Sequence, residues 1–350
     1  MPTTSFTKAG ILMLIIVLSF FVWWEIYLRN QGIKISYDDG EGLWADKRAM
    51  VYEPAEKATV FIGSSRNKFD LDIATWQQLT GDHAIQLGIE GNSPLPILDD
   101  LAADKDFKGK LVIDVTEGLF FSTSPHNITD PVDKVKYFKK RTPAQRFSFL
   151  VNEQLEKRLV FLDKDHLSLT AMLEGLPIPK RKGVFALPNP CPREFNPVSF
   201  ERQNIMTKRF ESDTMMQKQV TGLWDFYRIT SKDPPANPAK TDSMIATIHK
   251  DIEQIKQRGG VVIFVRTPSS GPYWEGEQRG FPRAMYWDKL LSATGVNGIH
   301  FKDYPAIDHF LCPEFSHLKQ GDAIVFTQNL AKILEQEKGW KFSKSPVAVN

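Results

Sequence analysis

The sequence predicts an α/β fold, a three-layer sandwich with a mostly parallel sheet, preceded by one transmembrane helix. Residues 9–28 form one apolar run, strand-like and helix-like segments alternate over 59–115, and this alternation returns over 241–337. A chain of 350 residues, 42% of them hydrophobic, can bury one large core. The formal net charge of +2 gives no whole-surface attraction to nucleic acid, so no nucleic-acid partner is expected.

The N-terminal apolar run has about the 20 residues that a helix needs to cross a bilayer. Trp23, Trp24 and Tyr27 lie at its far end, where aromatic rings favour the membrane interface. No small-residue cleavage site follows the run, which argues against a cleaved signal peptide. Residues 1–30 are therefore predicted to be a signal anchor, with a buried core helix as the alternative.

Residues 31–56 show little hydrophobic periodicity and are predicted to be a tether, followed by a folded domain over 57–345. The short N-terminal head favours an N-terminus inside the cell, so this domain would face the periplasm or the exterior. In that compartment Cys191 and Cys312 could form a disulfide, and within the chain they could pair only with each other. Two free buried thiols are the alternative.

The first half of the domain follows a β-α-β-α-β order, which predicts a parallel sheet with helices on both faces. Short apolar runs rich in β-branched residues indicate interior strands, and apolar residues at helical spacing indicate the helices between them. Strands are expected at 59–62, 84–89 and 110–115, and helices at 71–79 and 94–101.

The middle of the chain, 122–238, interrupts this order with many prolines and is predicted to be an inserted helical and irregular region. Helices are expected at 142–159 and 200–229. The basic run 134–141 is either a solvated face or a contact for anionic glycan or lipid headgroups.

Regular alternation resumes after the insertion and completes the sheet. The pattern predicts helices at 241–258, 283–293 and 322–337, and strands at 261–265 and 298–301. The last helix has a continuous apolar side, which indicates that it packs against the sheet.

Gly63, Ser64 and Ser65 follow the first strand, at the sheet edge where open α/β sheets carry their chemistry. The serines either cap the next helix or supply a nucleophile, which would need a base and an acid that orients it. Glu314 precedes His317 by three residues in the loop before the last helix, so one turn of chain can join the carboxylate to the imidazole. His317 as a cap or core residue is the alternative.

These blocks, with Gly91 in the turn after the second strand, resemble the ordered motifs of the SGNH, or GDSL, hydrolase superfamily. The resemblance implies that Ser65 is the nucleophile, His317 the general base and Glu314 the orienting acid. It also implies that the backbone amides of Ser65 and Gly91 act as oxyanion donors.

The chain departs from that pattern at three places. Ser64 and Glu314 stand where the superfamily usually has aspartate, and residues 114–118 lack the asparagine that normally completes the oxyanion hole. Thr116 or Asn92 could donate instead, or the hole has two donors only.

The GSSR form of the first motif and the single N-terminal span resemble the membrane-anchored branch of the superfamily, which includes the lipoteichoic acid D-alanylation protein and the alginate and cellulose acetylation proteins. This resemblance implies O-acyl transfer, with acetyl expected, onto an exported polysaccharide or cell-envelope glycan, beside a membrane-bound O-acyltransferase partner. It also implies a bacterial inner membrane protein. A carbohydrate esterase with the same triad and a catalytically weak scaffold are the alternatives.

Arg266 follows the strand at 261–265 and Arg66 follows Ser65, so each could bind an anionic group of the acceptor or form a structural salt bridge. The aromatic tract 271–287 could stack on sugar rings or pack in the core. No motif indicates a cofactor, and His309 and His317 lack a third ligand at the spacing of a metal site, so neither a cofactor nor a metal is expected.

Overall fold

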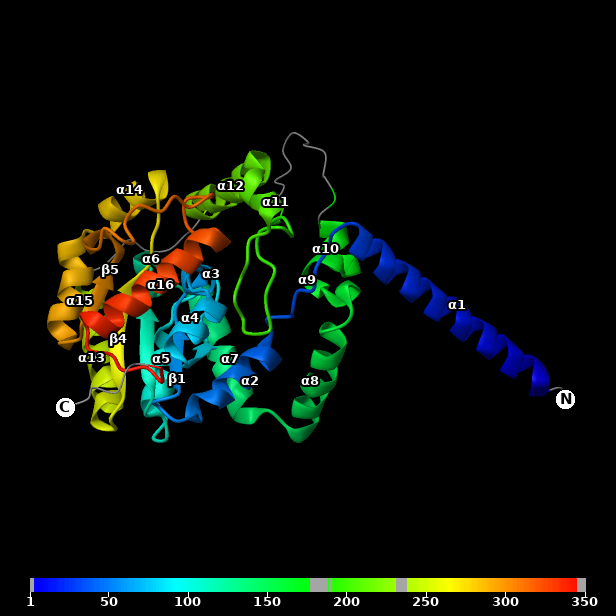
Figure 1. Ribbon diagram of the computed structural model, residues 1–350, viewed down its shortest axis with the longest axis horizontal. Helices are drawn as coiled ribbons and strands as arrows, with labels where there is room; N and C mark the ends of the chain where they lie inside the picture. Colours follow the sequence, from blue (N-terminus) through cyan, green and yellow to red (C-terminus); the bar gives the residue numbers. More distant parts are fainter. Residues whose placement is uncertain (1–2, 175, 177–187, 189, 231–237, 345–350) are drawn as a thin grey trace. The chain divides into compact units, whose positions relative to one another are not determined.

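Figure 1 shows the computed structural model of the chain, which describes residues 3–174, 176, 188, 190–230 and 238–344. The chain divides into two compact units. Unit 1 contains the described residues of Met1–Asp38 and Pro143–Ala186, and unit 2 contains those of Asp39–Thr142 and Leu187–Asn350.

Unit 2 is built on a five-stranded sheet in which all neighbouring strands are parallel. The strands are β1 (Ala58–Ile62), β2 (His83–Gln86), β3 (Lys110–Asp114), β4 (Val261–Arg266) and β5 (Gly298–His300). Their order is β2-β1-β3-β4-β5, which is one of the two common orders of doubly wound sheets. The direction of winding reverses between β1 and β3, and ligands of such sheets bind at the carboxyl ends of the strands at this point.

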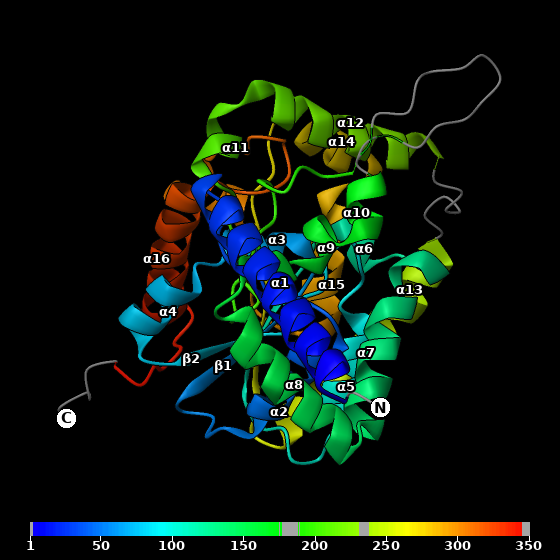
Figure 2. The same cartoon turned by 90° about the vertical axis from the view of Figure 1, so that its right-hand side faces the viewer.

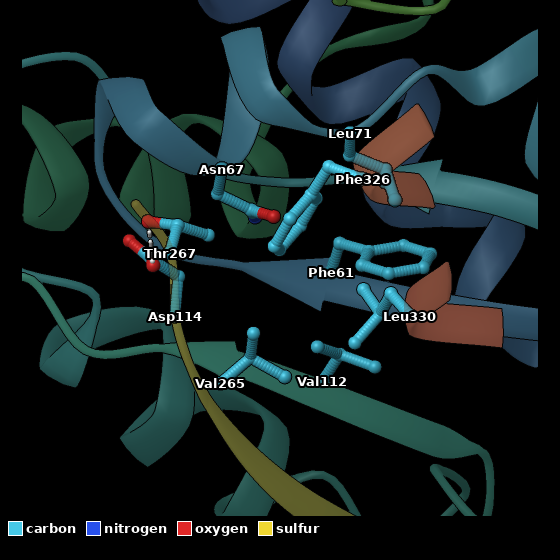
Figure 3. Close-up of a pocket in the computed structure, with 9 residues that line it drawn as sticks. All are labelled: Phe61, Asn67, Leu71, Val112, Asp114, Val265, Thr267, Phe326 and Leu330. Carbon is cyan, nitrogen blue, oxygen red and sulfur yellow. Dashed lines mark hydrogen bonds between the residues drawn. The ribbon is translucent and has the colours of Figure 1, made fainter. Parts of the chain in front are cut away.

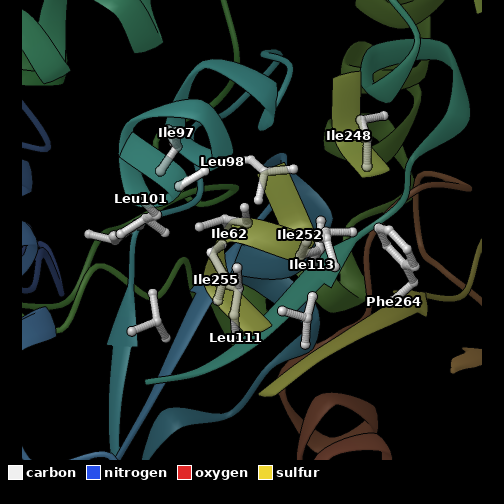
Figure 4. Packing of buried hydrophobic residues seen from close by; sticks show 14 of the residues in the cluster. Ile62, Ile97, Leu98, Leu101, Leu111, Ile113, Ile248, Ile252, Ile255 and Phe264 are labelled. Carbon is white, nitrogen blue, oxygen red and sulfur yellow. The ribbon is translucent and has the colours of Figure 1, made fainter. Parts of the chain in front are cut away.

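Side chains alternate between the two faces of the sheet, so each face carries its own apolar core. Val60, Ile62, Leu111 and Ile113 belong to the first core, part of which is drawn in Figure 4. This face is covered by α2 (Glu41–Ala49), α5 (Leu95–Ala103), α7 (Thr129–Lys140), α13 (Pro238–Gln257) and α15 (Trp287–Thr294).

Phe61, Val112, Ile263 and Val265 point to the opposite face. It is covered by α3 (Ser65–Asp70), α4 (Ile73–Thr80) and α16 (Gln320–Gln336). Figure 2 shows α4 and α16 side by side. Unit 2 therefore has the predicted α/β class with helices on both faces of a parallel sheet. A cavity of about 10 Å³ lies within this second core, with Asp114 and Thr267 at its polar end (Figure 3). It has room for about one water molecule.

The prediction of a tether over 31–56 is wrong for its second half. Residues 41–52 form α2 and a 3₁₀ turn, η1 (Met50–Tyr52), which belong to unit 2. Trp44 is fully buried and donates its indole N–H to the carbonyl of Leu87 over 3.0 Å. Arg48 forms a buried ion pair of 2.8 Å with Asp100 of α5. The polar sequence of α2 does not indicate a buried helix, because the partners that neutralise its buried charges lie far away in the sequence.

The predicted insertion over 122–238 is divided between the two units. Its part in unit 2 holds α7, α11 (Lys208–Ser212) and α12 (Thr214–Thr230), so the helix expected at 200–229 starts eight residues later and is broken at Asp213. Its part in unit 1 holds α8 (Pro143–Glu156), η3 (Val160–Leu162), α9 (Lys164–Leu167) and α10 (Leu169–Glu174). The remaining short helices, all in unit 2, are α6 (Glu117–Phe120), η2 (Pro125–Asn127), α14 (Gly271–Gly280), η4 (Arg283–Met285) and η5 (Phe301–Asp303).

Unit 1 begins with α1 (Thr3–Asn30). Its segment Phe6–Asn30 is long and apolar enough to cross a membrane, and only 6% of its most apolar window is buried in the protein. This assignment rests on length and composition, and an N-terminal signal helix has the same two properties.

Candidate active site

Ser65 is the first residue of α3 and lies directly after the carboxyl end of β1. Gly63 allows this tight entry: a Cβ there would lie 2.6 Å from the Cβ of Asp114 and 2.7 Å from that of Asn67, closer than side chains pack. Ser64 occupies the N-cap position but makes no capping hydrogen bond through its side chain. Its hydroxyl instead donates to the Thr116 hydroxyl at 3.1 Å.

Ser65, His317 and Glu314 form a continuous chain of hydrogen bonds. The Oγ of Ser65 lies 2.8 Å from Nε2 of His317, and Nδ1 of His317 lies 3.0 Å from Oε1 of Glu314. Because an ionised carboxylate only accepts hydrogen bonds, Nδ1 carries the proton, and in the neutral ring Nε2 is left to accept the Ser65 proton. Ser65 is half-buried, whereas Glu314 and His317 are buried. This is the geometry of a nucleophile, a base and an orienting acid.

Glu314 is held ionised by the donors around it. Burial by itself raises the pKa of this carboxyl, but His317 and Trp224 together lower it below its ordinary value. Oε1 accepts from the ring and from the backbone N–H of His317, the latter at 2.7 Å, and Oε2 accepts from the indole N–H of Trp224 at 2.7 Å. The charge on Glu314 is thus fixed beside the imidazole that it orients.

The loop that carries His317 is anchored on both sides of the imidazole. Phe315 has a φ of 73°, a left-handed conformation uncommon for an aromatic residue, and its carbonyl accepts from the N–H of Ser270 at 3.0 Å. The N–H of Leu318 donates to Oδ1 of Asp70 at 2.9 Å. Asp70 is at the end of α3, so the helix that begins with the serine also fixes the backbone next to the base.

Three aromatic rings surround the imidazole of His317. The ring centroids of Phe69, Phe195 and Trp224 lie 4.5, 5.7 and 6.1 Å from that of His317. Phe195 and Trp224 come from the inserted region, where they pack with Phe210 in a small apolar cluster. Sequence reasoning missed both residues, because the helical periodicity of 214–230 indicates an apolar face but not its partner.

The turn with Gly91 lies beside the Ser65 loop, because the N–H of Ile89 donates to the carbonyl of Gly63 at 3.0 Å. Gly91 has a φ of 65°, which glycine adopts without strain. The side-chain amide of Asn92 donates to the carbonyl of Glu90 at 2.7 Å, and the Thr116 hydroxyl donates to Asp114 at 3.1 Å. The hydroxyl hydrogen of Thr116 is thereby used, whereas Nδ2 of Asn92 has a second hydrogen that can still donate.

A network of buried charged side chains supports the turn that contains Gly91. Arg202 is fully buried and donates to the carbonyls of Gln86 and Gly88 at 2.8 and 2.9 Å, while it is paired with Asp39. Lys68 of α3 binds Asp39 at 2.6 Å and Glu90 at 2.9 Å. The turn after β2 and the helix that starts with Ser65 are therefore tied to one set of charges.

Arg66 and Arg266 are both buried in a second network, which agrees with the salt-bridge alternative and leaves neither open to solvent. Glu277 bridges them: one carboxylate oxygen binds Arg66 and the other lies 2.5 Å from Arg266. Glu117 binds Nε of Arg266 at 2.8 and 3.0 Å. In this arrangement the ion pairs of the two arginines join the loop after β1 to the end of β4 and to α14.

Cys191 and Cys312 are both free, so the predicted disulfide is wrong for this structure. Cys312 is buried in the core under α16, whereas Cys191 packs against the apolar cluster around Phe195. Burial raises the pKa of both thiols, that of Cys191 to about 12.

The other candidates from the sequence have structural partners. Lys134 of the basic run donates to the carbonyl of Asp39 at 3.0 Å, and Lys139 pairs with Asp100 at 2.7 Å. In the aromatic tract 271–287, Trp287 is buried and Trp274 packs edge-on against Phe301. Among the described residues, no group of three or more His, Cys, Asp or Glu side chains could hold a metal ion.

We found no family model and no curated protein that matches this chain.

Proposed function

We propose that this protein transfers an acyl group, with acetyl as the expected group, through an acyl-serine intermediate on Ser65 to a hydroxyl of an exported polysaccharide or cell-envelope glycan. The single observation that carries this proposal is the hydrogen-bonded chain from Ser65 through His317 to Glu314. A base at hydrogen-bond distance with a buried acid behind it is what turns a serine hydroxyl into a nucleophile.

The two half-reactions use the same atoms. In the first, Oγ of Ser65 bonds to the acyl carbonyl carbon, Nε2 of His317 takes the hydroxyl proton, and that proton then goes to the leaving group as its bond to carbon breaks. In the second, an acceptor hydroxyl gives its proton to Nε2 and displaces Ser65, whose oxygen recovers the proton. Glu314 stabilises the imidazolium in both steps, and the amides of Ser65 and Gly91 would hold the oxyanion.

The rings of Phe69, Phe195 and Trp224 pack around the imidazole and hold it toward Ser65, whereas transfer rather than hydrolysis rests on the resemblance. Three parts of the proposal rest on the resemblance to membrane-anchored SGNH hydrolases. They are the exported glycan as acceptor, a membrane-bound O-acyltransferase that supplies the acyl group, and a location in the bacterial inner membrane. The apolar helix α1 is compatible with a membrane anchor.

The test is intact-protein mass spectrometry of the full chain in detergent after exposure to a chromogenic acetyl ester. We expect one acetyl adduct that is absent in Ser65→Ala and retained in Ser64→Ala, because the Ser64 hydroxyl is buried and bonded to Thr116 rather than to a base. His317→Ala should slow its formation at least a hundredfold.

The fate of the adduct separates the candidate reactions. Acetylated product after addition of an oligosaccharide indicates transfer, whereas free acetate at an unchanged rate indicates an esterase. An adduct that persists in Ser65→Ala, or an exported glycan still acetylated in cells that carry only that variant, would contradict the proposal and favour the scaffold.

A further inference from the structure

Helix α8 of unit 1 exposes a row of large apolar side chains. Phe147, Leu150, Val151 and Leu155 are 69, 53, 44 and 44% exposed. Their spacing of three, four and eight residues from Phe147 puts them on one side of the helix. Asn152 lies beyond the edge of this arc, so α8 is amphipathic and its apolar side is exposed.

Helix α10 repeats the pattern a short distance along the chain. Leu169, Met172 and Leu173 are 74, 48 and 57% exposed, at spacings of three and four residues. Single exposed apolar residues are common on protein surfaces, but two helices close together in the sequence that each expose a group of large apolar side chains indicate a binding surface.

The segment between these helices is fixed to the last third of α1. The carboxylate of Glu25 accepts from the N–H groups of Val160 and Phe161 at 3.0 and 3.2 Å, and Phe161 stacks on Phe21 with ring centroids 5.3 Å apart. Arg29 donates to the carbonyl of Arg158 at 2.9 Å. The 3₁₀ turn η3 is therefore held against α1 by contacts spread over two turns.

These contacts set the depth of η3 relative to the membrane that α1 would cross. At 1.5 Å per residue, Phe21 and Glu25 lie only about 14 and 8 Å along the helix from Asn30. If the apolar run 9–28 crosses the membrane, Glu25 lies about 5 Å and Phe21 about 10 Å inside its end at residue 28, close to Trp23, Trp24 and Tyr27 at the interface. The two backbone donors of η3, together with Arg29 at 2.7 Å, satisfy the Glu25 carboxylate, which is costly to leave unpaired at this depth.

We propose that α8 and α10 form a second, peripheral membrane contact, lying on the lipid surface beside the anchor with their apolar side chains among the outer parts of the acyl chains. Lipid is the occupant because η3, which follows α8 directly, is fixed at the membrane boundary by α1. Amphipathic helices bind lipid in this manner, with the polar side toward water. The inference rests on the part of the proposed function that makes α1 a membrane anchor.

The test places a fluorophore at single cysteines in the full chain, in a Cys191→Ser and Cys312→Ala background, reconstituted in phosphatidylcholine vesicles. Leu150→Cys, Phe147→Cys and Leu173→Cys report on the apolar sides, Asn152→Cys on the polar side of α8, and Met13→Cys on α1. We expect lipids with an acyl-chain nitroxide to quench the first three labels several-fold more than the Asn152 label, and aqueous iodide to show the reverse order. Circular dichroism of each variant identifies a folding defect. Because two sites on α8 are labelled, the test still works if one of these two variants does not fold.

The Met13 label separates the failure of this inference from the failure of the anchor. If lipid quenches Met13 while iodide reaches Leu150, Leu173 and Asn152 equally, the peripheral contact does not exist, although the anchor does. If lipid quenches none of the labels, both fail. Protection of the apolar labels from both quenchers would overturn the lipid assignment in favour of a protein contact, such as a second copy of this chain.

Discussion

The indole N–H of Trp224 donates to Oε2 of Glu314 over 2.7 Å, which is the carboxylate oxygen that His317 does not use. Trp224 lies on α12, within the inserted region, whereas Glu314 lies in the loop before α16. The charge of the candidate acid therefore depends on a helix that interrupts the α/β pattern.

Replacement of Trp224 by Phe is expected to slow acylation of Ser65. A hydrogen bond to a charged group contributes about 1.5–3 kcal/mol, which corresponds to a loss of roughly 10- to 100-fold if it acts fully in the transition state. The acylation rate from the mass-spectrometric assay measures this effect. Tyr227→Phe is the matched control, because Tyr227 is exposed on the same helix. Equal rates in Trp224→Phe and wild type would show that the indole only fills space.

Trp224→Phe is also expected to change how the stability of the protein depends on pH. The folded-state pKa of Glu314 is lowered, so its contribution is present above the unfolded pKa of about 4.3 and is lost as the pH falls through the folded value. We expect the wild type to melt at a higher temperature than Trp224→Phe at pH 7 and this difference to shrink below about pH 4. A difference that is constant with pH would mean that the indole does not act on the ionised carboxylate.

Replacement of Glu277 by Gln is expected to destabilise the protein strongly. It leaves the buried Arg66 and Arg266 without their shared counter-charge, and breaking such a pair costs about 3–5 kcal/mol. Glu275→Gln on the same helix is the control, since its carboxylate is mostly exposed and should change the free energy of unfolding by less than about 0.5 kcal/mol. Denaturant unfolding at pH 7 measures both. Similar midpoints for the two variants would contradict the role of Glu277.

The Glu277 effect should also disappear in acid. The two arginines overcome burial and lower the pKa of Glu277 to about 2, so its stabilising contribution is present above about pH 4.3 and is lost as the pH falls toward 2. Unfolding curves between pH 7 and pH 2 should therefore show the wild type approaching Glu277→Gln.

Asp70 is expected to act as a neutral acid. It is fully buried, Oδ2 has no hydrogen-bond partner among the described residues, and burial raises its pKa well above the ordinary value. A raised pKa means that stability falls as the pH rises above about 3.9, the unfolded value. Asp70→Asn should therefore be at least as stable as the wild type at pH 8, while Asp70→Ala loses the acceptor for Leu318 and costs about 1–3 kcal/mol. Melting temperatures across this pH range measure the effect, and a large loss in Asp70→Asn would show that the ionised form is needed.

The two thiols are expected to react only when the chain unfolds. With the pKa of Cys191 near 12 and Cys312 buried, little thiolate is present at pH 8. Mass spectrometry after iodoacetamide treatment should show two alkyl groups on the denatured, unreduced chain and almost none on the native one. Complete resistance of the unreduced, denatured chain to alkylation would restore the disulfide.

The contact between Ser65 and His317, 252 residues apart, could be predicted because both residues lie in loops that follow strands of one parallel sheet. Short β-branched runs identify interior strands, and residues after parallel strands of one sheet meet at its carboxyl edge. The spacing of Glu314 and His317 likewise lies within one turn of chain. These features need no knowledge of distant packing.

The rest of the site could not be predicted, because its partners are chosen by packing between distant segments. Nothing in the sequence around Trp224 indicates a carboxylate 90 residues away, and nothing around Arg66 indicates Glu277, 211 residues away. The sequence predicts a tether where the polar helix α2 lies for the same reason, since the ion pair of Arg48 with Asp100 has no local signal.

The direct pairing of β3 with β4 has a consequence for how the chain is made. Lys110 pairs with Val261, about 150 positions later, and the intervening residues belong to both units. At a synthesis rate of about 5–20 residues per second, β4 is synthesised roughly 8–30 s after β3, and during this time one edge of β3 has no neighbouring strand. An apolar strand with an open edge is prone to pair with other chains. The newborn protein should therefore depend on a chaperone during that interval, although the finished sheet has β3 in its centre.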